Sequence, residues 1–470
     1  MIGHSSMLHL SLPYITAALA FLLGGVLVSL KVSRPRRTAA VAAALAFFCF
    51  LAAARESGAA GQGRLHDPLL SFFQADGLSA VPMAFYAALT LMVLVLAPRR
   101  DVADRSPSGM LLISLSVQTA YAAASWVPLV AGWWLSCLPF ALGMFGSQKE
   151  TRLTIGIRLA SCIALTAAVL LLSGPSTAGF AEYGTLWAIF FTIAVVCRKG
   201  LFPLHAGVVH AFEHGPLLPK ALLFNGHLGV VLVARAMAVS QPAAAHHAFE
   251  FLSMAAVATV GIASLRAFAE SKPRRLLAFL CISQASFMLA GITSTNIEGV
   301  TGALTHWLVV AAASTGLICI VRALEVRVSS TEDPLMHLGL AAKAPRLATF
   351  FLICGLALVG LPGTLGYCAE ELIFHGMLQN HFGAGIVLLV ATVFNAINLL
   401  RLYNTLFLGV LPKHVINIPD ALPRERWPLT ACILFLVLGG LMPRVVIGWR
   451  SDAASSIEKA LPAAGGSGHH

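Results

Sequence analysis

Residues 198–235, RKGLFPLHAGVVHAFEHGPLLPKALLFNGHLGVVLVAR, combine charged side chains and prolines inside an otherwise apolar chain. The adjacent cations Arg198 and Lys199 come first, and Pro203 follows them. Ionisable groups at membrane depth are costly, and they usually face a hydrated interior where they mark an ion or proton path. A proline inside a spanning helix frees backbone carbonyls, which is tolerated where the break is buried in protein or lines a cavity. We therefore interpret this stretch as part of a transport machinery.

The composition of the whole chain is that of an integral membrane protein. Of the 470 residues, 58% are hydrophobic and 11% are charged, and the mean hydropathy is +0.83. Soluble domains carry roughly 25% charged residues. The net charge of +11 does not indicate nucleic-acid binding, because the cations lie mostly in short loops between apolar runs. The nine cysteines show no CxxC pair or metal-type spacing, so we expect no metal site and no cofactor in this chain.

The apolar runs predict an all-α polytopic membrane protein of about fourteen transmembrane helices, at roughly 20 residues per crossing. The predicted spans are 12–31, 38–54, 78–98, 110–126, 127–146, 154–174, 184–202, 217–238, 249–269, 275–293, 300–323, 347–374, 383–408 and 428–448. The gaps between these spans are too short for a soluble domain. Residues 465–470, GGSGHH, are interpreted as a remnant of an expression tag.

Lysines and arginines are concentrated in the loops that follow odd-numbered spans, and the even-numbered loops are poor in cations. Cytoplasmic loops of membrane proteins carry an excess of lysine and arginine. This distribution predicts that both termini lie on the outer face. Two termini on the same face require an even number of spans, which agrees with the predicted fourteen.

Two of the predicted helices contain central breaks. The seventh meets Pro203, and the twelfth meets Pro362 and Gly363. Proline kinks are common in membrane helices, and that is the simpler interpretation. Paired broken helices followed by ionisable groups are, however, typical of transporters built from two inverted repeats. We predict a first repeat in residues 101–240 (helices 4–8) and a second in 241–410 (helices 9–13). Helices 1–3 would occupy residues 1–100, and helix 14 residues 411–464.

Several short blocks, in a consistent order over roughly residues 75 to 410, carry a family resemblance. They are Asp76-Gly77-Leu78-Ser79, the block from Arg198 to His205, residues 216–235, Arg274 to Phe279 with Ile282-Ser283-Gln284, Thr305-His306, Leu361-Pro362-Gly363-Thr364 with Gly366 and Glu370, and Arg401 with Phe407 and Gly409. Together they resemble the antiporter-like membrane subunits shared by NADH:quinone oxidoreductase (complex I), Mrp-type sodium/proton antiporters and membrane-bound hydrogenases. The resemblance implies a proton channel of two half-paths joined at mid-membrane by a row of lysines, glutamates and histidines.

The sequence departs from this family at three positions of the row. Trp134 aligns with the glutamate of the fifth helix, Arg198 with the lysine of the seventh, and Val310 with the lysine that follows Thr305-His306. A lysine can pass on its proton, whereas an arginine stays charged. Arg198 would then be a fixed charge, with Lys199 pointing about 100° away from it on the helix.

The resemblance and the residue types together give a set of candidate side chains. The predicted proton or ion path comprises Arg198, Lys199, His205, His227, His306 and Glu370. The candidate path entrances are His210, Glu213, His214, Lys220 and Glu371, and the helix breaks are Pro203, Pro362 and Gly363. Each candidate has a plainer alternative: a solvated loop for His210, Glu213 and His214, a snorkelling side chain for Lys220, and a hydrogen-bonded core histidine for His227. Of the adjacent acids Glu370 and Glu371, only one is expected to face the path.

The leading functional hypothesis is a proton- or cation-translocating subunit of a larger energy-converting complex in the bacterial inner membrane. The chain has no nucleotide loop, haem motif or cysteine cluster, so redox chemistry or any other energy input would come from partner subunits. Expected partners are other membrane subunits, a peripheral energising subunit and the lipid bilayer, with no nucleic acid. One alternative is the membrane partner in a two-component (DAB-type) inorganic-carbon uptake system, with a zinc-bearing, carbonic-anhydrase-like subunit. A second alternative is a non-conducting scaffold for a peripheral enzyme.

Overall fold

The computed structural model describes residues 8–61, 63–145, 152–172, 177–238, 244–328, 339–410 and 418–458. The segment interpreted as a tag remnant, 465–470, lies outside the described residues. Nearly all of the described chain is helical, which confirms the all-α prediction. A two-residue antiparallel pair, β1 (Leu65–His66) and β2 (Gln74–Ala75), and two 3-10 turns, η1 (Arg99–Val102) and η2 (Leu340–Ala342), complete the regular structure described.

In the first half of the chain the helices are α1 (Tyr14–Ser29), α2 (Pro35–Ala59), α3 (Ala80–Leu96), α4 (Ser106–Ala122), α5 (Trp126–Leu135), α6 (Leu138–Ala141), α7 (Arg152–Leu172), α8 (Thr177–Lys199), α9 (Ala206–His214), α10 (Leu217–Asn225) and α11 (Leu228–Met237). In the second half they are α12 (Ala244–Ala269), α13 (Pro273–Ile292), α14 (Ile297–Val328), α15 (Pro345–Leu358), α16 (Leu365–Asn380), α17 (Phe382–Phe407), α18 (Pro423–Leu441) and α19 (Pro443–Glu458).

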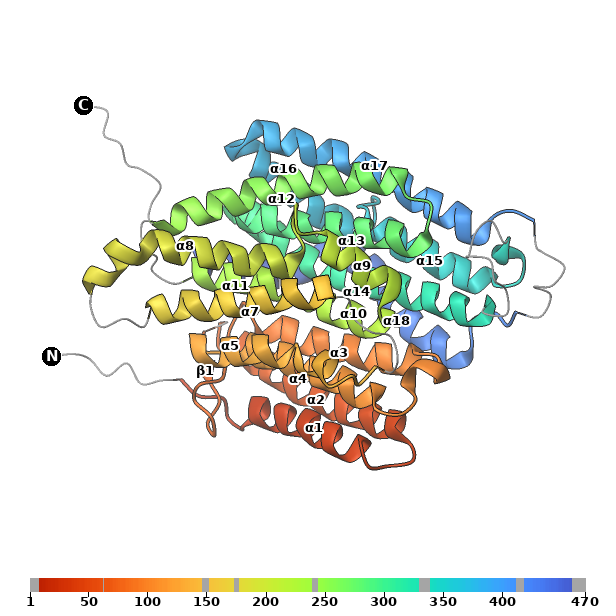
Figure 1. The fold of residues 1–470 in the computed structure, drawn as a ribbon, viewed down its shortest axis with the longest axis horizontal. Helices are drawn as coiled ribbons and strands as arrows, with labels where there is room; N and C mark the ends of the chain where they lie inside the picture. The colour runs from red at the N-terminus through yellow and green to blue at the C-terminus, as the bar shows by residue number, and fades with distance from the viewer. Residues whose placement is uncertain are drawn as a thin grey trace.

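The helices run roughly side by side along the long axis of the molecule (Figure 1). The helices α1 and α2 lie along one edge, α16 and α17 lie along the opposite edge, and α13 and α14 lie between them. In α13 and in α14, 94% of the most apolar stretch is buried, compared with 28% in α7 and 33% in α17. The outer helices therefore present apolar side chains to lipid, while α13 and α14 form the centre where polar residues can be enclosed.

The positions of these helices agree with a polytopic membrane protein. Among the described residues, seven helices are long and apolar enough to cross a membrane, or eight if α18 and α19 count as one bent span. Four shorter apolar helices fall on further predicted spans. The connections α1–α2 and α12–α13, which both carry cations, lie at the same end of the molecule (Figure 1). The two connections follow the first and the ninth predicted spans. Because successive spans run in opposite directions, loops after odd-numbered spans are expected at the same end.

The two predicted breaks are present. The backbone leaves the helix between α8 and α9, where Gly200 has a φ of +67°, and between α15 and α16, where Gly360 and Gly363 have φ values of +71° and +89°. Glycine adopts this left-handed region without steric cost, so each break follows from the local sequence.

Two predicted spans differ from the structure in detail. The span 217–238 is divided at Gly226 and His227, and His227 itself adopts a left-handed φ of +41°. The span 428–448 is not straight, because α18 ends at Leu441 and α19 turns away from it by 84°. Pro443 begins α19, and a proline cannot continue the hydrogen-bond pattern of the preceding helix.

Gly366 tests how tightly the second break is packed. A Cβ added there would lie 1.9 Å from the carbonyl oxygen of Ala357. We expect Gly366→Ala to destabilise the protein by about 1–3 kcal/mol, the usual cost of forcing an extra methyl group into a packed core. The measurement is the thermal unfolding midpoint of the purified protein in detergent. Gly383→Ala in α17 is the matched control, because its Cβ would have no atom within 4 Å. An equal midpoint for the two variants would contradict the packing described.

Candidate functional site

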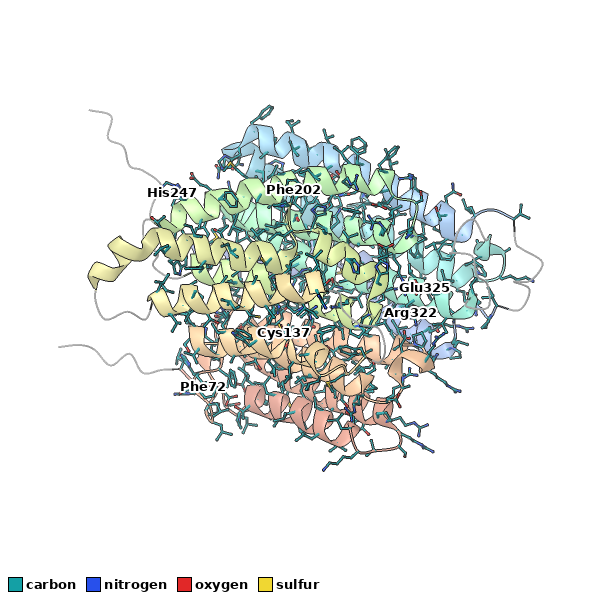
Figure 2. All side chains as sticks on the ribbon, in the orientation of Figure 1. Phe72, Cys137, Phe202, His247, Arg322 and Glu325 are labelled. Atoms are coloured by element: carbon teal, nitrogen blue, oxygen red, sulfur yellow. The ribbon has the colours of Figure 1, made fainter. Side chains whose placement is uncertain are left out.

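Arg198 and Lys199 occupy the last turn of α8, immediately before the first break. Phe202, within that break, lies midway along the molecule between His247 near one end and Glu325 near the other (Figure 2). The break therefore lies at mid-depth in the bundle. Since consecutive residues point in different directions on a helix, the two cations reach different neighbours.

Arg198 faces α5. Its guanidinium donates a hydrogen bond to Ser136 Oγ, and its Cζ lies 4.7 Å from the centre of the Trp133 ring. Trp134, which sequence alignment places at the glutamate position, points outward instead. Its indole Nε1 donates to Thr166 Oγ1 at 2.9 Å, and the residue is 40% exposed. Arg198 thus has as neighbours an aromatic ring of α5, the hydroxyl group of its C-cap residue Ser136, and Cys137.

Lys199 faces the centre of the molecule. Its Nζ donates to His227 Nδ1 at 3.2 Å, and both residues are almost fully buried. The left-handed backbone of His227 separates α10 from α11 and places the imidazole at this contact. Gly229 makes room for the lysine stem, because a Cβ there would lie 2.6 Å from Lys199 Cγ. The predicted path residues Lys199 and His227 are therefore in direct contact.

The second half contributes His306 and Glu370. His306 Nε2 donates to Gln284 Oε1 at 2.9 Å, and this pair joins α14 to α13. Glu370 on α16 is 2% exposed, and its carboxylate faces Gln284 and Thr392. A Cβ on Gly360 would lie 2.4 Å from Glu370 Oε2, so the carboxylate lies against the backbone of the second break. Gln284 thus lies between the histidine and the acid.

The Lys199–His227 pair from the first half of the chain and the His306–Gln284 pair from the second half are connected along α14. The indole of Trp307 packs edge-on against His227, with ring centres 6.5 Å apart, and it follows His306 in the chain. One turn or more further along, Ser314 Oγ donates to Asn225 Oδ1 at 2.9 Å, and Asn225 Nδ2 donates to Thr315 Oγ1 at 2.8 Å. The buried residues of α14 therefore connect the break at His227 with the His306–Gln284 pair.

Several atoms along this row have no hydrogen-bond partner among the described residues. They are Nε2 of His227, Nδ1 of His306, Nε2 of Gln284 and Oε1 of Glu370. An imidazole nitrogen can accept a proton, and a carboxylate oxygen can accept or release one. The arrangement can therefore support proton exchange between side chains of the two halves.

The remaining candidates are less central. His205 is half-buried and stacks on Phe202. Lys220 is 4% exposed and does not snorkel, because its Nζ lies 4.0 Å above the Phe140 ring. Glu371 is exposed on α16, so of the two adjacent acids only Glu370 faces the interior.

The candidate entrance at the end of α9 belongs to an ion-pair cluster. Glu213 accepts from Lys272 at 2.7 Å and from Arg275 at 2.9 Å, and Arg275 also pairs with Glu270 at 2.8 Å. The hydrogen-bonded Arg275 guanidinium holds the pKa of Glu270 below its usual value. His214 is exposed beside this cluster, with its ring centre 4.4 Å from that of His210.

Sequence reasoning missed Arg158 and Phe140. Arg158 lies near the start of the predicted span 154–174, and its Cζ is 4.3 Å above the Phe140 ring. A charged residue inside a predicted span is itself a signal of a functional site, so this cation could have been found. Its position opposite Lys220 depends on how α6 and α7 pack, which the sequence does not reveal.

Comparison of the sequence with known proteins gives matches to one family of membrane subunits. The family model described as NADH:quinone oxidoreductase/Mrp antiporter, TM, matches residues 153–395, more than half of the chain. NADH-quinone oxidoreductase subunit M of Rickettsia conorii is 31% identical over 276 residues, which cover 57% of this chain and 54% of the relative. The same subunit of Rickettsia bellii is 30% identical over 267 residues, covering 56% and 53%. The chain spans about half the length of the curated relatives it matches.

Solved structures share the fold over nearly the whole chain. A chain of respiratory complex I from Thermus thermophilus with bound NADH matches with a TM-score of 0.80 and 22% identity, covering 96% of this chain and 100% of that one. A chain of the Mrp complex from Dietzia sp. matches with a TM-score of 0.77 and 19% identity, covering 94% and 97%. With the match of the family model, these findings lead to one conclusion: this multi-pass membrane chain belongs to the NADH:quinone oxidoreductase/Mrp antiporter transmembrane family.

Proposed function

We propose that this chain is a proton-translocating subunit of a larger energy-converting complex in the bacterial inner membrane, with both of its termini on the outer face. The observation that carries the proposal is the buried row that runs from Lys199 and His227 through His306 to Gln284 and Glu370. Polar and ionisable groups enclosed in a lipid-facing bundle are expensive, and a row of them is typical of proton relays.

Each side chain has a role in this proposal. Lys199 and His227 exchange a proton across their 3.2 Å contact. His306 passes the proton into the second half, and Glu370 receives it beside the second break. Arg198 stays charged and sets the electrostatic potential near Lys199, because an arginine does not release its proton.

The helix breaks give the row a means of control. Irregular backbone at mid-membrane is tolerated where it lines a cavity, and broken helices are where transporters open and close their half-paths. Charge movement at one end of the row would change proton affinity at the next group. Coupling of this kind lets each half-path open in turn.

The comparisons support other membrane subunits as partners, since the similar solved structures are chains of the respiratory complex I, of the Mrp complex and of a membrane-bound sulfane sulfur reductase. We propose that a redox partner energises this chain. The inorganic-carbon alternative would replace that partner with a zinc-bearing, carbonic-anhydrase-like subunit. Mass spectrometry of the purified native complex distinguishes the two by the subunits that accompany this chain.

Proton flux in liposomes tests the proposal directly. The native complex is reconstituted, a potassium diffusion potential is imposed, and internal pH is followed with a trapped dye. We expect acidification faster than in liposomes without protein. Equal rates would overturn the proposal and favour the scaffold alternative. Uptake of radioactive sodium without acidification would reassign the transported ion.

A further inference from the structure

An apolar crevice runs along α3 between α2 and α18. It encloses about 400 Å³, and its walls include Phe47 of α2, Phe85 of α3 and Pro428 of α18. A second cavity of about 650 Å³ adjoins it, because Phe47, Phe85, Ala88 and Phe435 line both. Phe85 and Ala88 are only half-buried, so the crevice is open at the surface of the bundle. No charged side chain is among the described residues that line the crevice itself.

The crevice has the length of one lipid leaflet. On α3 its lining extends from Phe85 to Val95, which is about 15 Å at a rise of 1.5 Å per residue. The hydrocarbon core of a bilayer is about 30 Å thick, so one leaflet contributes about 15 Å. An acyl chain of a lipid in one leaflet therefore matches the crevice in both length and polarity.

Three arginines meet at the Val95 end of the crevice. Arg36, at the start of α2, donates a hydrogen bond from its Nη2 to the carbonyl oxygen of Val95. The charged neighbours of Arg36 are Arg99 of η1 and Arg424 in the first turn of α18. Arg424 precedes Pro428 by four residues, so both lie on the side of α18 that faces the crevice. We call Arg36, Arg99 and Arg424 the arginine cluster.

The acids next to the arginine cluster in the chain are bound to other cations. Asp101 pairs with Arg322 at 2.6 Å, and Glu425 pairs with Arg327 at 2.6 Å. Among the described residues, no ion pair joins a member of the arginine cluster to an acid. Arg424 Nε is buried and has no hydrogen-bond partner in the described part of the chain. Positive charge is therefore unbalanced at the place where the apolar crevice ends.

We propose that the crevice binds one anionic phospholipid, with its phosphate at the arginine cluster and one acyl chain along α3 toward Phe85. Guanidinium groups bind phosphate oxygens through charge-assisted hydrogen bonds, and basic pockets between transmembrane helices bind anionic lipid headgroups. The start of α2 lies at the same end of the molecule as the α1–α2 connection, where a headgroup at the membrane surface would lie (Figure 1). The lipid would fill the space between α2 and α18. The inference does not rest on the proposed proton translocation, since lipid binding is measured without flux.

Photolabelling with a phospholipid probe tests the proposal. The native complex is reconstituted into phosphatidylcholine bilayers that contain phosphatidylglycerol with a diazirine at the end of one acyl chain. After illumination, mass spectrometry of the digested protein locates the label. We expect it on α3 and α18 around Phe85 and Phe435, because the chain extends about one leaflet from the arginine cluster. A phosphatidylcholine probe with the same diazirine should label these positions more weakly.

Variants separate recognition of the headgroup from occupation of the crevice. Arg99→Gln and Arg424→Gln are each expected to lower labelling by phosphatidylglycerol about fivefold, the contribution of one basic side chain near an anionic lipid. Lys31→Gln, at an exposed cation in the α1–α2 connection, is the matched control. Ala431→Trp introduces a large ring into the lining of the crevice and should abolish labelling there. Ala258→Trp, on an exposed face of α12, controls for the added ring.

The thermal unfolding midpoint of each variant shows that it folds, so a loss of labelling at an unchanged midpoint supports the proposal. Equal labelling by the two probes in the wild-type protein would show that the headgroup is not recognised, and it would overturn the proposal. Labelling that Arg99→Gln and Arg424→Gln leave unchanged would have the same meaning. Label on peptides of another subunit, in place of α3 and α18, would show that a partner helix occupies the crevice and would also overturn it.

Discussion

Replacement of Glu370 by glutamine is expected to lower proton flux on the order of 100-fold, the size of effect typical when a proton-transferring side chain is removed. Glu370 is 2% exposed, and its carboxylate lies between Gln284 and the backbone of Gly360. A glutamine has nearly the same shape and keeps hydrogen-bonding capacity, but it cannot accept and release a proton. The loss would therefore report proton exchange at this position and not a packing defect. The measurement is the acidification rate of liposomes that carry the reconstituted complex.

The adjacent acid provides the matched control. Glu371 is the next residue on the same helix, but it is exposed. Glu371→Gln makes the same chemical change on an exposed face of α16, so flux should remain at the wild-type rate. If Glu370→Gln retained wild-type flux, the path would not pass through this carboxylate. If both variants lost flux and the complex was recovered in low yield, an assembly defect would explain the result.

The fold could be predicted well because its signals are local. Apolar runs of spanning length set the helix positions, and Pro203 and the Leu361-Pro362-Gly363 segment mark the two breaks. The third interruption was missed, although Asn225-Gly226 is a turn-forming dipeptide immediately before His227. The residues around this dipeptide form an apolar run of spanning length, so the run was interpreted as one continuous helix. The bend before α19 had a similar local signal in Pro443.

The candidate site was harder to predict because it depends on helix rotation. Alignment gives the order of Arg198 and Lys199 but not which of them faces the centre, and only the packed helices show that Lys199 contacts His227. The same limit applies on α5, where Trp134 is aligned with a glutamate but its side chain points outward. A residue's neighbours across the bundle depend on side-chain direction at each crossing, which sequence spacing alone does not determine.

Proton transport should require a side chain at position 199 that can lose its proton. Two substitutions distinguish this requirement from a requirement for positive charge alone. Lys199→Gln removes both the charge and the exchangeable proton, and we expect flux to fall on the order of 100-fold. Lys199→Arg keeps the positive charge beside His227, but an arginine does not release its proton. If Lys199 is a relay, the arginine variant should be nearly as inactive as the glutamine variant. The measurement is again acidification of liposomes carrying the complex.

The larger arginine must also fit, so folding is measured alongside flux. Gly229 lies against the stem of Lys199, and Lys199 also lines a cavity of about 80 Å³. Equal thermal midpoints for wild type and Lys199→Arg would show that the guanidinium is accommodated. Lys31→Arg makes the same exchange at an exposed loop position and should leave flux unchanged. Retained flux in Lys199→Arg would mean that a fixed positive charge is sufficient at this position, and the proton would then have to reach His227 by a route that bypasses Lys199.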